Sequence, residues 1–102
     1  MTEVKIPFKS EFKEAMLTDV KTWTSRTRRM GWNGDTFLAF GATFEIRALF
    51  QMRLGVVAHH HHVEEGFTNT EAFIDCWRRI HPRKGYVPEQ LVWVHVFKRR
   101  RD

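Results

Sequence analysis

Apolar residues recur at helical spacing in the second half of the chain, and this pattern predicts a helix with one apolar face. The segment Thr68–Glu71 fits a capping box at its start. His81-Pro82 predicts its end, because the residue before a proline avoids the α region. The apolar stripe, which we expect to be core with arginines opposite it, consists of Phe73, Cys76, Trp77 and Ile80.

Several other runs have the composition of strands. Residues 91–97 are rich in β-branched and aromatic side chains and predict a central strand, in which His95 alternates with valines and is expected to face away from the core. Pro7 lacks an N–H, so the run around it predicts a strand start or an edge. The strands expected from these patterns are 4–8, 36–40, 43–50, 52–57 and 91–97.

A shorter helical pattern follows the first of these runs. Ser10 is expected to be the N-cap of a helix of about ten residues, in which Phe12, Ala15 and Met16 recur at helical spacing. Strand, helix, several strands, helix and strand then succeed one another. We therefore expect one α+β domain over residues 1–102, a small mixed β-barrel with two main helices packed on it.

Charge and cysteine content narrow the class of protein. Seventeen Lys and Arg against twelve Asp and Glu give a net charge of +5, which favours a polyanionic partner. Cys76 is the only cysteine, so neither an intramolecular disulfide nor a thiolate zinc site is available. The charged first residues lack a signal-peptide core, and no window holds about 18 apolar residues. We expect a cytoplasmic protein with no membrane contact.

The stretch Lys21–Arg26, read KTWTSR, holds candidate chemistry. Thr24 and Arg26 are two apart and share one strand face, whereas Lys21 reaches Thr24 only if the chain turns between helix and strand. A lysine kept neutral by burial or by the charge of Arg26 would serve as base for a threonine nucleophile, which favours amide hydrolysis. An ordinary solvated polar strand is the competing interpretation.

The same stretch resembles the ASCH domains of the PUA-like superfamily, whose hallmark is a GxKxxTxR-like segment after the first helix. Here Asp19 or Val20 stands near the usual glycine. The likeness is closer to the small bacterial ASCH proteins that act as N4-acetylcytidine amidohydrolases. It extends to Gly34-Asp35 and to the segment 65–71, which resembles the stretch that carries the functional glutamate of that group.

The resemblance implies a catalytic set of Lys21, Thr24 and Glu65, with no metal and no cofactor. Lys21 would be the base, Thr24 the nucleophile, and Glu65 the group that orients Lys21 or protonates the departing amine. Glu64 is adjacent and remains an alternative. The residues expected to contact substrate or nucleic acid are Ser25, Arg26, Arg28, Arg29 and Lys84.

Two further points stay open at the level of sequence. His59–His62, followed by two glutamates, hold metal-ligand atoms, but four consecutive residues of a regular strand do not aim at one ion. A second function is an RNA-binding module that uses Arg28, Arg29 and the C-terminal basic tail, residues 98–101. A third is action on RNA itself. The substrate is a modified cytidine nucleoside or RNA, and the oligomeric state is either a monomer or a weak dimer.

Overall fold

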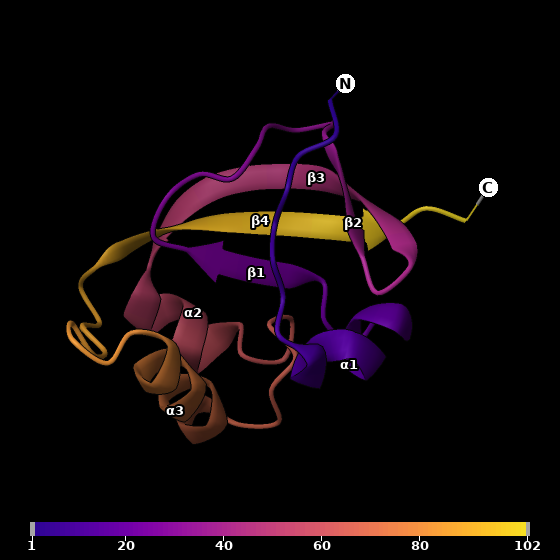
Figure 1. Ribbon diagram of the computed structural model, residues 1–102. Coiled ribbons are helices and arrows are strands. Elements are labelled where there is room, and N and C mark those ends of the chain that lie inside the picture. The colour runs from indigo at the N-terminus through magenta and orange to yellow at the C-terminus, as the bar shows by residue number, and fades with distance from the viewer. Residues whose placement is uncertain (1, 102) are drawn as a thin grey trace.

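The computed structural model describes residues 2–101, and its centre is one sheet of four antiparallel strands in the order β1-β4-β3-β2. The sheet curls into a half-barrel with helices below it (Figure 1). This arrangement confirms the α+β class and the barrel-like sheet. The elements are a 3₁₀ turn at Ser10–Phe12, α1 at Lys13–Leu17, β1 at Trp23–Arg26, β2 at Thr36–Ala39, β3 at Ala42–Arg53, α2 at Leu54–His60, α3 at Thr70–Ile80 and β4 at Leu91–Arg99.

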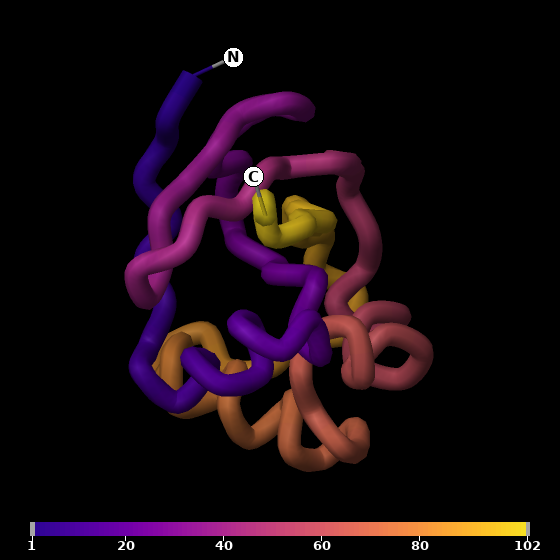
Figure 2. Tube along the Cα trace, turned by 90° about the vertical axis from the view of Figure 1, so that its right-hand side faces the viewer, coloured from indigo at the N-terminus to yellow at the C-terminus, as the bar shows by residue number. Residues whose placement is uncertain are grey.

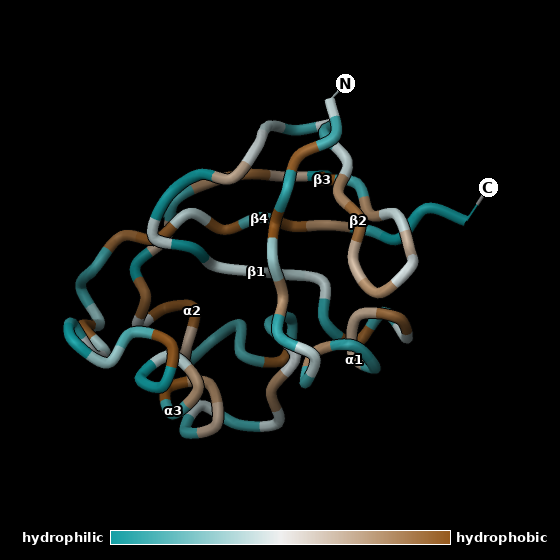
Figure 3. Tube along the Cα trace, in the orientation of Figure 1, coloured by the Kyte–Doolittle hydropathy of each residue, from teal (hydrophilic) through white to brown (hydrophobic). Residues whose placement is uncertain are grey.

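Strand β4 is central, as its composition predicts, and its two faces belong to two different cores. Phe97 packs in a cluster with Ile6, Phe37 and Phe44, whereas Val92 and Val94 pack with α2 and α3. In Figure 2 the N-terminal segment lies on the side of the sheet away from α2. The sheet is therefore covered on both sides, which explains why β4 is almost continuously apolar (Figure 3).

Strand β3 is longer than expected and bends. Its pairing with β4 shifts between Ile46 and Ala48, so that Arg47 is the extra residue of a bulge. A bulge increases the local twist of a strand, and here it accompanies the curl of the sheet. A tight turn at Phe40-Gly41, both with positive φ, joins β2 to β3.

Several expected elements differ from the structure. The run 4–8 is extended chain with one bridge nearby, Glu3 to Thr36, rather than a strand. Ser10 lies inside the 3₁₀ turn and does not cap it, and the helix that follows has only five residues. The cap of α3 is Asn69, whose side chain accepts a hydrogen bond from the N–H of Ala72 at 2.8 Å.

The expected strand at 52–57 is also wrong, because β3 ends at Arg53 and α2 begins at Leu54. The fully buried residues of this helix are Leu54, Val57 and Ala58, which stand at i, i+3 and i+4. Adjacent valines favour a strand on composition, but only a helix brings these three side chains onto one face. Within residues 2–101, no helix combines the length and apolar character needed to span a membrane.

Candidate functional site

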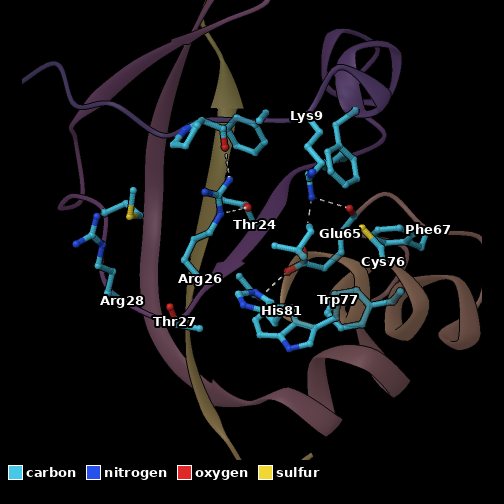
Figure 4. A pocket seen from close by; sticks show the side chains of 18 residues that line it. Lys9, Thr24, Arg26, Thr27, Arg28, Glu65, Phe67, Cys76, Trp77 and His81 are labelled. Atoms are coloured by element: carbon cyan, nitrogen blue, oxygen red, sulfur yellow. Dashed lines mark hydrogen bonds and ion pairs between the residues drawn. The ribbon is translucent and has the colours of Figure 1, made fainter. Parts of the chain in front are cut away.

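A cavity of about 500 Å³ lies along the exposed edge of β1, between the N-terminal segment and α3. Figure 4 shows Thr24 and Arg26 on one side of it and Glu65, Cys76 and Trp77 on the other. Because β1 is an edge strand, residues from both of its faces reach the cavity. Of the residues predicted from sequence, the cavity brings together Lys21, Thr24, Ser25, Arg26, Arg28 and Glu65.

Lys21 enters the cavity because the chain turns sharply after α1. Asp19 has a φ of 62°, and the N–H groups of Val20 and Lys21 both donate to the carbonyl of Ala15 at 2.9 Å. Asp19 thus adopts the left-handed conformation that favours glycine, at the glycine position of the GxKxxTxR pattern. The chain therefore turns sharply between α1 and β1 without the glycine.

The Lys21 amine is almost completely buried and has defined partners. Nζ donates to the carbonyl of Trp23 at 2.8 Å and to the carbonyl of Glu65 at 2.7 Å, and it lies 3.6 Å from Glu65 Oε1. It also lies over the ring of Phe12. Burial lowers the pKa of Lys21; the carboxylate of Glu65 opposes this shift, and the charge of Arg26 adds to it.

Thr24 and Arg26 interact directly on one face of β1, as their spacing predicts. Arg26 Nε donates to Thr24 Oγ1 at 3.0 Å, and Arg26 Nη2 donates to the carbonyl of Pro7 at 2.7 Å. The guanidinium also lies over the Phe8 ring, 4.9 Å from its centre. A cationic donor on the hydroxyl stabilises an oxyanion at that oxygen relative to the neutral hydroxyl. The described bonds of Lys21 Nζ go to carbonyls, and none goes to Thr24 Oγ1.

The segment that carries Glu65 is attached to the start of β1. The carbonyl of Glu64 accepts from the N–H groups of Thr22 and Trp23, both at 2.9 Å. The side chains of the two glutamates have different surroundings. Glu65 is 3% exposed and lines the cavity, whereas the Glu64 carboxylate is partly exposed and lies 3.2 Å from His61 Nδ1.

Gly66 follows Glu65 and leaves room for Lys21. Its φ is 96°, and a Cβ placed there would lie 3.0 Å from Lys21 Cβ. Gly34 has a similar φ of 90°, and no atom lies within 4 Å of a Cβ placed there. Replacing Gly34 by alanine therefore measures the cost of the backbone conformation alone. We expect Gly34→Ala to cost about 1–2 kcal/mol, and Gly66→Ala to cost about 1–3 kcal/mol more.

Chemical denaturation of the two glycine variants measures this difference. Equal losses of unfolding free energy would show that the Lys21 stem yields freely and that Gly66 is needed only for its φ.

His95 was expected to face away from the core, and this expectation is wrong. Its side chain is fully buried, and the N–H of Met30 donates to Nε2 at 2.9 Å. Nε2 is therefore unprotonated, and Nδ1–H donates to the carbonyl of Thr24 at 3.2 Å. His95 thus connects the backbone at Thr24 to the loop after β1.

Burial lowers the pKa of His95 in the folded protein. The unfolded chain, with an ordinary histidine pKa of about 6.5, takes up a proton first as pH falls. We expect the free energy of unfolding to decrease from about pH 6.5 downward, at up to about 1.4 kcal/mol per pH unit for this group. Urea denaturation between pH 7.5 and 5.5 tests this, and His95→Gln should show a shallower decline. Identical slopes would contradict it.

Other predicted residues lie outside the cavity lining. Arg29 is exposed, and its guanidinium lies 3.5 Å from the centre of the Trp32 ring. Lys84 is exposed in the turn after α3. The histidines diverge: His61 stacks on Trp23, and His62 Nδ1 lies 2.9 Å from the carbonyl of Ala58. Within residues 2–101, no three or more His, Cys, Asp or Glu side chains are grouped so as to hold a metal ion.

The aromatic lining of the cavity was not predicted as a site. The apolar stripe of α3, which was expected to be core, also lines the cavity through Phe73, Cys76 and Trp77. The ring of Trp77 lies against that of His81, with 4.2 Å between the ring centres. Burial and the nearby Glu11 raise the pKa of the Cys76 thiol, so it is a poor nucleophile. The aromatic lining residues are Phe8, Phe12, Phe67, Phe73, Trp77 and His81.

No protein-family model matches the sequence, and no curated protein matches it significantly. Solved structures do match. The ASCH domain from Lactobacillus crispatus JV V101 is 11% identical, with a TM-score of 0.75 over 96% of this chain and 78% of that chain. A DUF984 protein from Enterococcus faecalis V583 is 16% identical, with a TM-score of 0.64 over 97% of this chain and 75% of that chain. At such identities the likeness establishes the fold, and this chain has the fold of an ASCH domain.

Proposed function

We propose that this protein is a metal-independent amidohydrolase that removes the acyl group from N4-acylated cytidine, either as a nucleoside or as a base in RNA. One observation carries the proposal: Lys21, Thr24 and Glu65 line a single cavity, in which burial favours the neutral form of the lysine. The likeness of the Lys21–Arg26 stretch to the amidohydrolase group of ASCH proteins supports the same reaction.

In the proposed reaction, Lys21 accepts the proton of the Thr24 hydroxyl as Oγ1 attacks the acyl carbonyl. A bond forms between Oγ1 and the carbonyl carbon, and the electron pair of the C=O double bond moves to its oxygen. When that pair returns, the bond from carbon to N4 breaks, and the proton held by Lys21 passes to the amine, either directly or through the Glu65 carboxylate. Water then hydrolyses the acyl-threonine, with Lys21 again as base.

The surroundings of these groups suit a flat, partly apolar ligand. Aromatic rings from the N-terminal segment and from α3 offer stacking surfaces for a pyrimidine base. Arg26 already donates to Thr24 Oγ1, and this contact favours the oxyanion that the attack requires. Lys9 and Arg28 are exposed on the cavity lining and would attract a phosphate-bearing form of the substrate.

The test is to incubate purified protein with N4-acetylcytidine and follow ultraviolet absorbance as cytidine forms. We expect turnover that excess chelator leaves unchanged. N4-methylcytidine, which has no amide bond, is the control and should stay intact. Absence of turnover, together with RNA binding that weakens as salt rises, would replace the proposal with a binding function.

A specific observation favours such a binding module as the second candidate. Trp32 is 59% exposed with Arg29 stacked on it, and the neighbouring Arg28 lines the cavity. Exposed aromatic and arginine side chains stack on unpaired bases. Two arginines of the C-terminal tail also have partners within the chain: Arg99 donates to the carbonyl of Leu17, and Arg101 is paired with Asp19.

A further inference from the structure

The carboxylate of Glu65 has two different neighbours, one for each oxygen. Ser25 Oγ donates to Oε2 at 2.6 Å, and both side chains are buried. Oε1 lies 3.6 Å from Lys21 Nζ, beyond the length of a hydrogen bond between charged groups. A short bond to a neutral hydroxyl therefore coexists with a longer approach to a cation.

One of the three positions around the Lys21 nitrogen makes no described hydrogen bond, although the Glu65 carboxylate and the Phe12 ring lie near the amine. Two of its N–H groups donate to the carbonyls of Trp23 and Glu65. The remaining position is a third proton in the ammonium form and a lone pair in the neutral amine. A base must direct this position at the hydroxyl it deprotonates. Direct pairing with the Glu65 carboxylate would instead favour the ammonium form of Lys21, in which this position carries a proton and cannot accept one.

We propose that Ser25 is a positioning residue that holds the Glu65 carboxylate off the Lys21 amine, so that this amine remains available as the base for Thr24. The role of Lys21 as a base rests on the proposed function. The arrangement of the Lys21, Ser25 and Glu65 side chains does not depend on it. It also gives Ser25 a role other than substrate contact, since its hydroxyl proton is committed to Glu65.

Loss of the Ser25 hydroxyl would leave Oε2 buried without its donor. A buried carboxylate oxygen without a partner is costly, and Lys21 is the cation already beside it. We expect the carboxylate to move to hydrogen-bond distance from Nζ. A closer carboxylate stabilises the ammonium form, which opposes the effect of burial on the pKa of Lys21.

The matched variants are Ser25→Thr and Ser25→Val, because threonine and valine have the same shape and differ by the hydroxyl. Ser25→Thr should retain wild-type kcat to within about threefold, whereas Ser25→Val should lose about tenfold or more with KM nearly unchanged. The rise of kcat/KM with pH should shift upward by about one pH unit in Ser25→Val. If the extra methyl group prevents folding, Ser25→Ala against wild type replaces the pair.

A second measurement does not depend on turnover. NMR titration of the lysine side-chain amines, with the Lys21 signal assigned by its loss in Lys21→Met, should give a higher midpoint for Ser25→Val than for Ser25→Thr. Equal midpoints would overturn the positioning role whether or not the protein hydrolyses amides. Different midpoints in a protein that leaves N4-acetylcytidine intact would keep the positioning role and reject the proposed function.

Discussion

Lys21→Met lowers kcat/KM for N4-acetylcytidine by about 10³-fold if Lys21 is the general base. Methionine keeps a flexible, unbranched apolar stem beside Gly66, and it removes the amine that lies over the Phe12 ring. The carboxylate of Glu65 retains its bond from Ser25, so the cavity should persist. Initial rates by ultraviolet absorbance measure the loss, and thermal unfolding checks that the variant folds.

Lys13→Met is the matched control for this variant. Lys13 is exposed at the first position of α1 and does not line the cavity, so its loss should leave kcat/KM within about twofold of wild type. A Lys21→Met protein that is folded and retains more than about a tenth of wild-type activity would remove Lys21 from the role of base.

Thr24→Val should have an effect at least as large, on the order of 10⁴-fold in kcat, because it removes the atom that attacks the substrate. Valine has nearly the shape of threonine, so the loss would report the hydroxyl rather than the packing of β1. Thr24→Ser keeps the hydroxyl and should retain measurable turnover. Mass spectrometry of the wild-type protein, quenched during turnover, should detect an acetyl group on Thr24.

Wild-type turnover by Thr24→Val would end the nucleophile assignment and leave Lys21 or Glu65 to activate a water molecule. Thr24→Val could also lose activity while the wild type shows no acetyl adduct, and this result would point to a different role for the hydroxyl. In that case the hydroxyl would position the substrate or a water molecule, with Arg26 as its donor, and no covalent intermediate would form.

The elements predicted correctly have strong local signals. Helix α3 combines an apolar stripe with a proline just beyond its end, and β4 is rich in β-branched and aromatic residues. Helix α2 was missed because seven residues are too short for periodicity to distinguish a helix from a buried strand. His95 was misassigned because alternation assumes one wet face, and β4 is covered on both.

One part of the candidate site could be predicted from residues close in sequence, and another part depends on contacts between distant segments. The spacing of Thr24 and Arg26 puts both on one face of a strand whatever the rest of the chain does, and the bond between them follows from that spacing. The approach of Glu65 to Lys21, across 44 positions, has no local signal. Only the resemblance to the ASCH amidohydrolases suggested Glu65, and it left Glu64 as an alternative.

Local periodicity and sterics are enough to predict the α+β class, the central strand, the last helix and the shared face of Thr24 and Arg26. Tertiary structure decided which glutamate enters the cavity, how deeply Lys21 is buried and that Ser25 binds Glu65. It also placed part of the apolar stripe of α3 along the cavity. These outcomes depend on how distant segments pack, and burial and partner geometry exist only after that packing has formed.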